Sequence, residues 1–165
     1  MGGWHDAGLR AMYPGGRADA RGRLLAHMWA SVFGLGLLPG RWVTLEVVGR
    51  RSGRVARFPL GMADWNGHWY LVSMLGERCN WVRNVRAADG RATLRGRHVI
   101  RCRLVEVPVD ERPPIIKRYL DKVPGARPHI PVDRHAAVAD FEAVSPRYPV
   151  FEVVPTPNKE GWNEE

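Results

Sequence analysis

Residues 44–60 constrain the fold of this 165-residue chain most, because two strand-like runs meet there at a short, glycine-rich turn. The apolar run around Leu45 and Val47 stops at Gly-Arg-Arg-Ser-Gly, residues 49–53, and alternation resumes beyond it. Glycine reaches positive φ without steric cost, and serine suits a tight turn. The pattern predicts a β-hairpin.

Four arginines crowd this turn and the strand that follows it: Arg50, Arg51, Arg54 and Arg57. Clustered guanidinium groups beside turn amides make a binding site for phosphate or carboxylate groups. A basic hairpin that only meets solvent is the alternative, and the turn by itself does not decide between the two.

A second anion-binding element is expected about thirty residues later. Residues 68–74 alternate as a strand, Gly76 interrupts it, and Asn80 is placed to cap a helix over residues 81–88 that Asp89 and Gly90 end. The start of such a helix offers unpaired N–H groups to an anion. Cys79 precedes the helix, where a thiol could be acidified. The alternative makes Trp81 a core residue and Asn84 a loop tether.

These pieces together resemble the deazaflavin (coenzyme F-420)-dependent nitroreductase family of the flavin/deazaflavin oxidoreductase superfamily. The resemblance rests on residues 49–53, on Pro59-Leu60, on Trp81-x-x-Asn84 with Ala87, and on residues 148–155 as a last strand. It covers roughly residues 41–155. It implies a mainly β fold with peripheral helices, a split β-barrel (FMN-binding-like) of about six mostly antiparallel strands.

The resemblance also implies a cofactor and the residues that bind it. Coenzyme F-420 is the expected cofactor, with FMN less favoured. Arg50, Arg51 and the turn amides would meet its acidic tail, and Pro59 would flank the deazaflavin ring. The Gly76 loop, Trp81 and Asn84 would lie at the phosphate and ring side. The full set of expected cofactor-binding residues is Arg50, Arg51, Ser52, Gly53, Arg54, Arg57, Pro59, Gly76, Cys79, Asn80, Trp81 and Asn84.

The implied activity is hydride transfer from the reduced deazaflavin to an electron-poor acceptor such as a quinone, an enone or a nitro compound. The cofactor supplies this chemistry, and the protein supplies position and charge. Tyr119, His129 and Tyr148 are candidate pocket residues or proton donors. Two alternatives stay open: a non-catalytic cofactor- or lipid-binding barrel, and a basic nucleic-acid-binding barrel. The resemblance further implies a homodimer.

The amino-acid composition limits the classes of partner that this chain is expected to bind. The net charge is +8, and 22 of the 25 basic residues are arginine, which favours bidentate binding of phosphates and carboxylates. The exposed, interleaved aromatic residues that stack on single-stranded nucleic acid are missing, so we expect no nucleic-acid partner. Cys79 and Cys102 have no paired spacing, and the histidines have no ligand-like spacing, so we expect a reducing cytoplasm and no metal site.

The remaining segments predict supporting elements. Residues 1–40 form an arm and a helix (residues 24–33) that packs on the barrel, with peripheral membrane association as a further role. Residues 41–155 form the barrel domain, and residues 156–165 form a tail. Residues 91–109 predict one strand with an arginine face and a bulge or sharp bend near Leu104. Helices are expected at 111–123 and 135–144.

Overall fold

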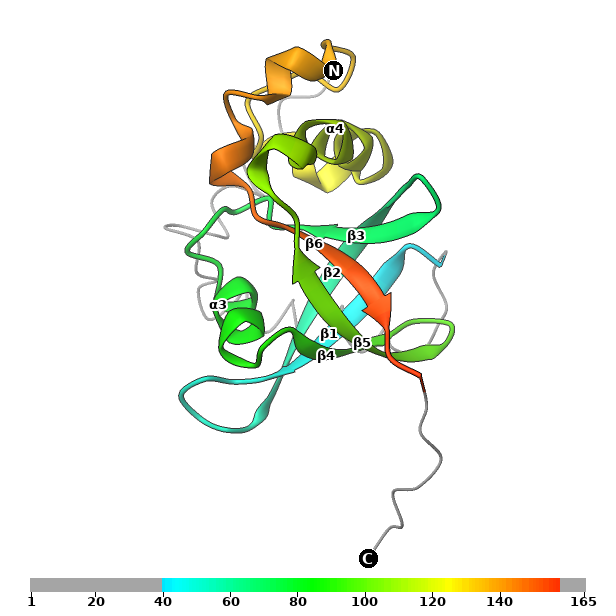
Figure 1. The fold of residues 1–165 in the computed structure, drawn as a ribbon, viewed down its shortest axis with the longest axis vertical. Helices are drawn as coiled ribbons and strands as arrows, with labels where there is room; N and C mark the ends of the chain where they lie inside the picture. The colour runs from blue at the N-terminus through cyan, green and yellow to red at the C-terminus, as the bar shows by residue number, and fades with distance from the viewer. Residues whose placement is uncertain (1–39, 158–165) are drawn as a thin grey trace, which may run out of the picture.

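The computed structural model describes residues 40–157. Within this range six strands close into one antiparallel barrel in the order β1-β2-β3-β6-β5-β4 (Figure 1). The strands are β1 (Trp42–Val48), β2 (Val55–Trp65), β3 (His68–Val72), β4 (Arg91–Arg95), β5 (Val99–Glu106) and β6 (Val150–Pro155). The expected fold class, a mainly β split barrel with peripheral helices, is therefore confirmed. The expected helix at residues 24–33 lies outside the described residues.

Two α-helices accompany the strands in the described range, α3 (Asn80–Ala87) and α4 (Arg112–Lys122). Pro113 and Pro114 occupy the first turn of α4, where a missing N–H costs nothing. The helix predicted over residues 135–144 is only a short 3-10 turn. The 3-10 turns are η2 (Val109–Glu111), η3 (Pro124–Ala126), η4 (Val138–Phe141) and η5 (Ser145–Arg147).

The barrel interior and α3 share one hydrophobic cluster. Leu45 on β1, Leu94 on β4 and Leu104 on β5 point into the barrel and are almost fully buried. Trp81 and Val85 of α3 belong to the same cluster, and the Trp81 ring meets Phe151 of β6 edge-on with centroids 5.5 Å apart. Packing against the barrel core therefore fixes the position of α3.

A second hydrophobic layer lies between α4 and the outer face of β2 and β3. The expected apolar face of α4, including Ile116, Tyr119 and Leu120, is buried there against Ala63 and Tyr70. Gly61 allows the close approach, since a Cβ at that position would stand 2.9 Å from the Val123 side chain. Figure 1 shows α4 above the barrel and α3 beside it, next to the end of the barrel from which the β1–β2 turn projects.

The prediction of a single strand over residues 91–109 is wrong. β4 and β5 form a hairpin around residues 96–98, with Leu94 opposite Ile100 and Arg95 opposite Val99. The alternation is real, because Leu94 and Cys102 are buried while Arg95 and Arg101 are exposed. The expected bulge near Leu104 is absent, since the β5–β6 register runs unbroken from Cys102 to Glu106. Val105 is 45% exposed on the outer face.

Candidate functional site

The β1–β2 turn is closed by its own backbone. The Gly49 N–H donates to the Arg54 carbonyl at 2.8 Å, and the Gly53 N–H donates to the Gly49 carbonyl at 2.9 Å. Gly53 adopts a φ of +67°, which favours glycine. Ser52 Oγ accepts the Arg54 N–H at 3.2 Å. The predicted hairpin is confirmed, and its turn presents the side chains of Arg50, Arg51 and Arg54 to solvent.

Arg50 joins this turn to α3. Its Nη1 donates to Asn84 Oδ1 at 2.8 Å, and its backbone N–H donates to the same oxygen at 3.3 Å. Its Nη2 donates to Asn80 Oδ1 at 3.4 Å. Asn84 is buried, with 5% of its surface exposed, so the acceptor of this partly buried contact is shielded from water. Two elements thirty residues apart, each expected to favour anions, thus meet through one arginine.

The other arginines of the predicted site differ in charge compensation. Arg51 and Arg54 make no side-chain hydrogen bond or ion pair in the described part of the chain, and the same holds for Arg78 and Arg83 around the start of α3. Arg57 donates from Nε to Glu46 Oε1 at 2.8 Å, so its side chain is already paired with an acid. At the predicted site, the arginines left to hold an anion are therefore those of the turn and of α3. Sequence reasoning missed Arg78 and Arg83, although both flank the predicted helix start.

The start of α3 differs from the prediction in its cap. Cys79, not Asn80, is the N-cap residue, and Asn80 is the first residue of the helix, where its side chain accepts from Arg50. Burial raises the pKa of the Cys79 thiol, so the expected acidification is wrong. Gly76 adopts a φ of +82°, and Ser73 Oγ donates to its carbonyl at 2.8 Å, which closes the loop before the helix.

The ladder between β2 and β3 ends beside this loop. Their register runs from Trp65 opposite His68 to Met62 opposite Leu71, and no β2 residue before Met62 pairs with β3. The first half of β2, from Val55 onward, pairs with β1 only. Pro59 lies in this first half, opposite Thr44 of β1. An edge is where a strand tolerates proline. The unpaired edge of β2 and the loop at Gly76 therefore border the point where the two strands separate.

Trp81 and two of the three candidate proton donors, Tyr119 and Tyr148, are buried. The third candidate, His129, is half-buried, and its role stays a prediction. Trp81 is 3% exposed and belongs to the core cluster, as the alternative interpretation held. Tyr119 and Tyr148 are buried, and burial raises the pKa of both phenols. The Tyr148 hydroxyl donates to the His129 carbonyl at 2.9 Å, so its proton is engaged by the backbone.

A chain of ion pairs that the sequence did not reveal fixes α3 and the loop at Gly76. Arg86 of α3 binds Glu77 at 2.6 Å and Glu106 of β5 at 2.6 Å. Glu106 also contacts Arg112 of α4 at 3.3 Å, and Arg112 is buried among backbone carbonyls, including that of Val107 at 2.8 Å. Arg86 and Glu106 are 20 residues apart and lie on different elements, so no local pattern could indicate this network.

Residues 40–157 contain no group of three or more His, Cys, Asp or Glu side chains that could hold a metal ion. No helix in this range is both long and apolar enough to cross a membrane.

The fold and the comparisons together define a class. The barrel is that of the split-barrel flavin/deazaflavin oxidoreductases, with an arginine turn against a helix start. The family model described as F-420H(2)-dependent quinone reductase matches residues 26–139, which is more than half of the chain. The chain belongs to this family. It is an oxidoreductase, and its cofactor is coenzyme F-420.

Solved structures share the fold at low identity. A protein of unknown function from Agrobacterium tumefaciens superimposes with a TM-score of 0.53 at 16% identity, over 81% of this chain and 54% of that one. A conserved hypothetical protein from Mycobacterium tuberculosis gives 0.51 at 14% identity, over 77% and 80%. A chain described as a domain-swapped dimer gives 0.50 at 18% identity, over 81% and 99%. A search of curated proteins finds no match.

Proposed function

We propose that the β1–β2 turn and the start of α3 hold the anionic part of coenzyme F-420. The observation that carries this proposal is the Arg50 contact with Asn84 and Asn80, which sets the turn against the helix. Arg51 and Arg54 stand exposed on that turn without an acidic partner in the described range. Guanidinium and amide donors are the groups that bind phosphate and carboxylate best. The residues present therefore fit the charged portion of the cofactor.

Each residue of the chain has a distinct task in this proposal. When bound, the deazaflavin supplies the hydride. Arg51 and Arg54 bind the anion, whereas Asn84 orients Arg50 and limits its motion. Trp81 supports the helix from the core and does not contact the ring. Pro59 and the Gly76 loop border the place where β2 and β3 separate, and we assign the deazaflavin ring to this border.

We propose a quinone as the electron acceptor, supported by the description of the family model. Enones and nitro compounds are the other electron-poor acceptors to test. Because the Tyr148 hydroxyl is held by a backbone carbonyl, we do not assign it as a proton donor, and solvent supplies the proton in this scheme.

Titration of the purified protein into F-420, and separately into FMN, tests the binding proposal by cofactor fluorescence. Saturable quenching with F-420 alone is the expected result. Binding of FMN alone would change the chemistry, and binding of neither would overturn the proposal. Reduced F-420 is then mixed with a quinone, an enone and a nitro compound in separate reactions. Tight binding without oxidation by any acceptor would favour the non-catalytic binding protein instead.

We also propose that the chain forms a homodimer. The support is the structural neighbour described as a domain-swapped dimer, together with exposed strand residues such as Val99 and Val154, which are 58% and 39% exposed. Light scattering coupled to size-exclusion chromatography should give twice the monomer mass of 18.6 kDa. A monomer mass across the concentration range would contradict this proposal.

A further inference from the structure

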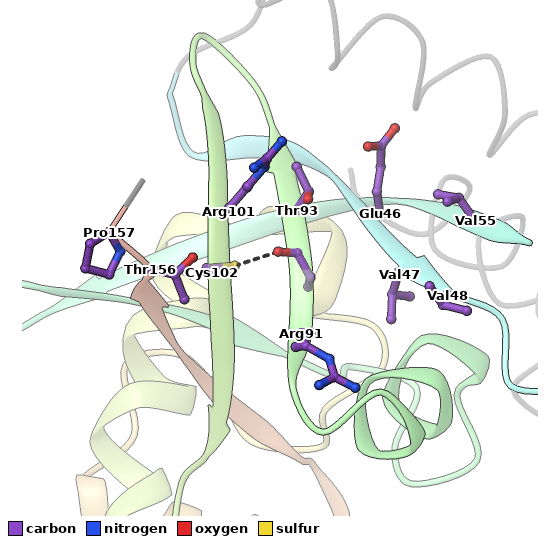
Figure 2. Close-up of a pocket in the computed structure, with 11 residues that line it drawn as sticks. Glu46, Val47, Val48, Val55, Arg91, Thr93, Arg101, Cys102, Thr156 and Pro157 are labelled. Atoms are coloured by element: carbon purple, nitrogen blue, oxygen red, sulfur yellow. Dashed lines mark hydrogen bonds between the residues drawn. The ribbon is translucent and has the colours of Figure 1, made fainter. Parts of the chain in front are cut away.

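A groove lies where β1 and β4 separate (Figure 2). The β1–β4 register runs from Thr44 opposite Arg95 to Glu46 opposite Thr93 and has no further pair. Beyond that point Val47 and Val48 continue along β1, and a cavity of about 560 Å³ opens between them and β4. This volume lies within the range of small-molecule sites. None of the residues expected from the sequence to bind F-420 lines this groove.

The walls of the groove are apolar. Val48 and Val55 stand opposite each other in register at the base of the β1–β2 turn, and they are 51% and 52% exposed. Cys102 lies at the groove with its thiol donating to the Ala92 carbonyl at 3.7 Å. Burial raises the pKa of Cys102 to about 11, so the thiol adds no negative charge near neutral pH. An apolar portion of a ligand would gain from covering these side chains.

Two arginines at the groove lack acidic partners. Arg91 and Arg101 make no side-chain hydrogen bond or ion pair with any residue of the chain that the structure describes. On the same two strands, by contrast, Arg95 binds Glu46 at 2.8 Å and Arg103 binds Asp89 at 2.9 Å.

The carboxylate of Glu46, which lines the groove, does not pair with Arg91 or Arg101. Glu46 is held between Arg57 and Arg95, each at 2.8 Å, and its side chain is only 10% exposed. Figure 2 shows Arg101 and Arg91 projecting from neighbouring strands, with Thr93 between them in the view. The groove is therefore apolar along its walls and carries two arginines that have no acidic partner among residues 40–157.

We propose that this groove binds an amphipathic carboxylate, with its hydrocarbon chain on Val48 and Val55 and its carboxylate on Arg91 or Arg101. Guanidinium groups bind carboxylates in a bidentate geometry, and the apolar walls select a ligand with a hydrocarbon portion. Nucleic acid fits less well, because none of the residues between 40 and 157 that line the groove is aromatic, and base stacking needs such side chains. This site is additional to the proposed cofactor site, which it adjoins at the base of the turn.

Equilibrium titration with cis-parinaric acid, a fluorescent long-chain carboxylic acid, tests the proposal. Its methyl ester and acetate serve as probes that lack the charge and the chain, respectively. We expect saturable binding of the acid, at least tenfold weaker binding of the ester, and no competition by acetate. Equal binding of acid and ester, or no saturable binding of the acid, would overturn the proposal. So would binding of the acid only when it is embedded in phosphatidylcholine vesicles.

Matched variants place the ligand in this groove. The double variant Arg91→Gln/Arg101→Gln should weaken binding of the acid about tenfold and leave the ester unchanged. Val48→Thr/Val55→Thr keeps the β-branched shape and should weaken both probes. Arg97→Gln is the control, because Arg97 is exposed in the β4–β5 turn and does not line the groove. Wild-type affinity in both double variants would overturn the proposal.

The same variants separate this site from the cofactor site. Arg91→Gln/Arg101→Gln should bind F-420 with the wild-type affinity, and F-420 should not displace the acid. Displacement by F-420 would mean that the groove belongs to the cofactor site, which would overturn the claim of a second site. Failure of F-420 to bind at all would refute the proposed function and leave the result with the acid intact.

Discussion

Asn84 shows at the scale of one residue how stability and binding are linked in this site. Its side-chain oxygen accepts from both the backbone and the guanidinium of Arg50, and the residue is buried. Hydrogen bonds that involve a charged group contribute about 1.5–3 kcal/mol, more than neutral ones. The Asn84 contact should therefore hold the arginine turn in place and stabilise the fold.

Replacing Asn84 by alanine should lower the free energy of unfolding by about 2 kcal/mol, because Arg50 then loses its buried acceptor. Urea denaturation measures this change. Asn80→Ala is the matched control: its contact with Arg50 is 3.4 Å long and exposed, so the loss should stay within about 0.5 kcal/mol. Equal losses in the two variants would contradict the role given to Asn84.

The ion pairs of Glu46 should make the stability of the barrel depend on pH in the acid range. Burial opposes its ionisation, but hydrogen bonds and charges from Arg95 and Arg57 outweigh this effect and hold the pKa of the carboxyl below its usual value. A depressed pKa in the folded state contributes stability that is present above the unfolded pKa, about 4.3, and is lost as pH falls through the folded value.

Wild-type protein should therefore lose stability below about pH 4 more steeply than Glu46→Gln, which cannot titrate at this position. Urea midpoints measured from pH 7 to pH 3 give the comparison. Glu142→Gln, at an exposed position without an ion pair in the described range, is the control and should follow the wild type. Parallel pH curves for Glu46→Gln and wild type would rule this explanation out.

At the scale of elements, the β4–β5 hairpin shows why one strand was expected. The turn holds three residues, 96–98, so residues that face each other across it have numbers of the same parity. Leu94 and Ile100 therefore keep the alternation of a single strand, and the sequence contains no sign of the reversal other than Gly96. The β1–β2 turn has six residues, two of them glycine, and its reversal was predictable.

The connection from α3 to β4 depends on Gly90. Its φ is +76°, a conformation that favours glycine. A Cβ there would lie only 2.5 Å from the Leu104 carbonyl oxygen, a backbone atom that cannot easily move aside. Gly90→Ala should lower the free energy of unfolding by about 2 kcal/mol or more. Gly125→Ala, where nothing lies within 4 Å of a Cβ, should be near neutral. Thermal or urea unfolding of both variants measures the difference, and similar free energies of unfolding for the two would refute this prediction.

Arg112 joins α4, β5 and the segment before β6. Its guanidinium binds the carbonyls of Val107, Ser145 and Tyr148, and it contacts Glu106. Arg112→Met should cost about 3 kcal/mol, because removing one partner leaves the remaining groups buried without donors. Arg147→Met, at an exposed position, is the control for urea denaturation. A loss below 1 kcal/mol would show that the network is not needed for the fold.

For the whole molecule, the net charge of +8 indicated an anionic partner but not its place. The structure divides the arginines into those held by acids, such as Arg57 and Arg86, and those without acidic partners in the described range, such as Arg51 and Arg54. That division depends on contacts between distant residues, which local patterns cannot supply. The β1–β2 turn and α3 were predictable because their signals are periodicity and glycine, which act locally, whereas the barrel was expected from the family resemblance.

The central claim is that the arginine turn beside α3 binds the charged part of F-420, and titration of F-420 into wild type and Arg51→Ala/Arg54→Ala at low and high salt tests it most directly. Losing contacts to charged groups should weaken binding about tenfold at low salt, and less at high salt because ions screen exposed charges. Arg97→Ala, on the β4–β5 turn, should match the wild type. Equal affinities for the double variant and the wild type, or a loss independent of salt, would contradict the claim.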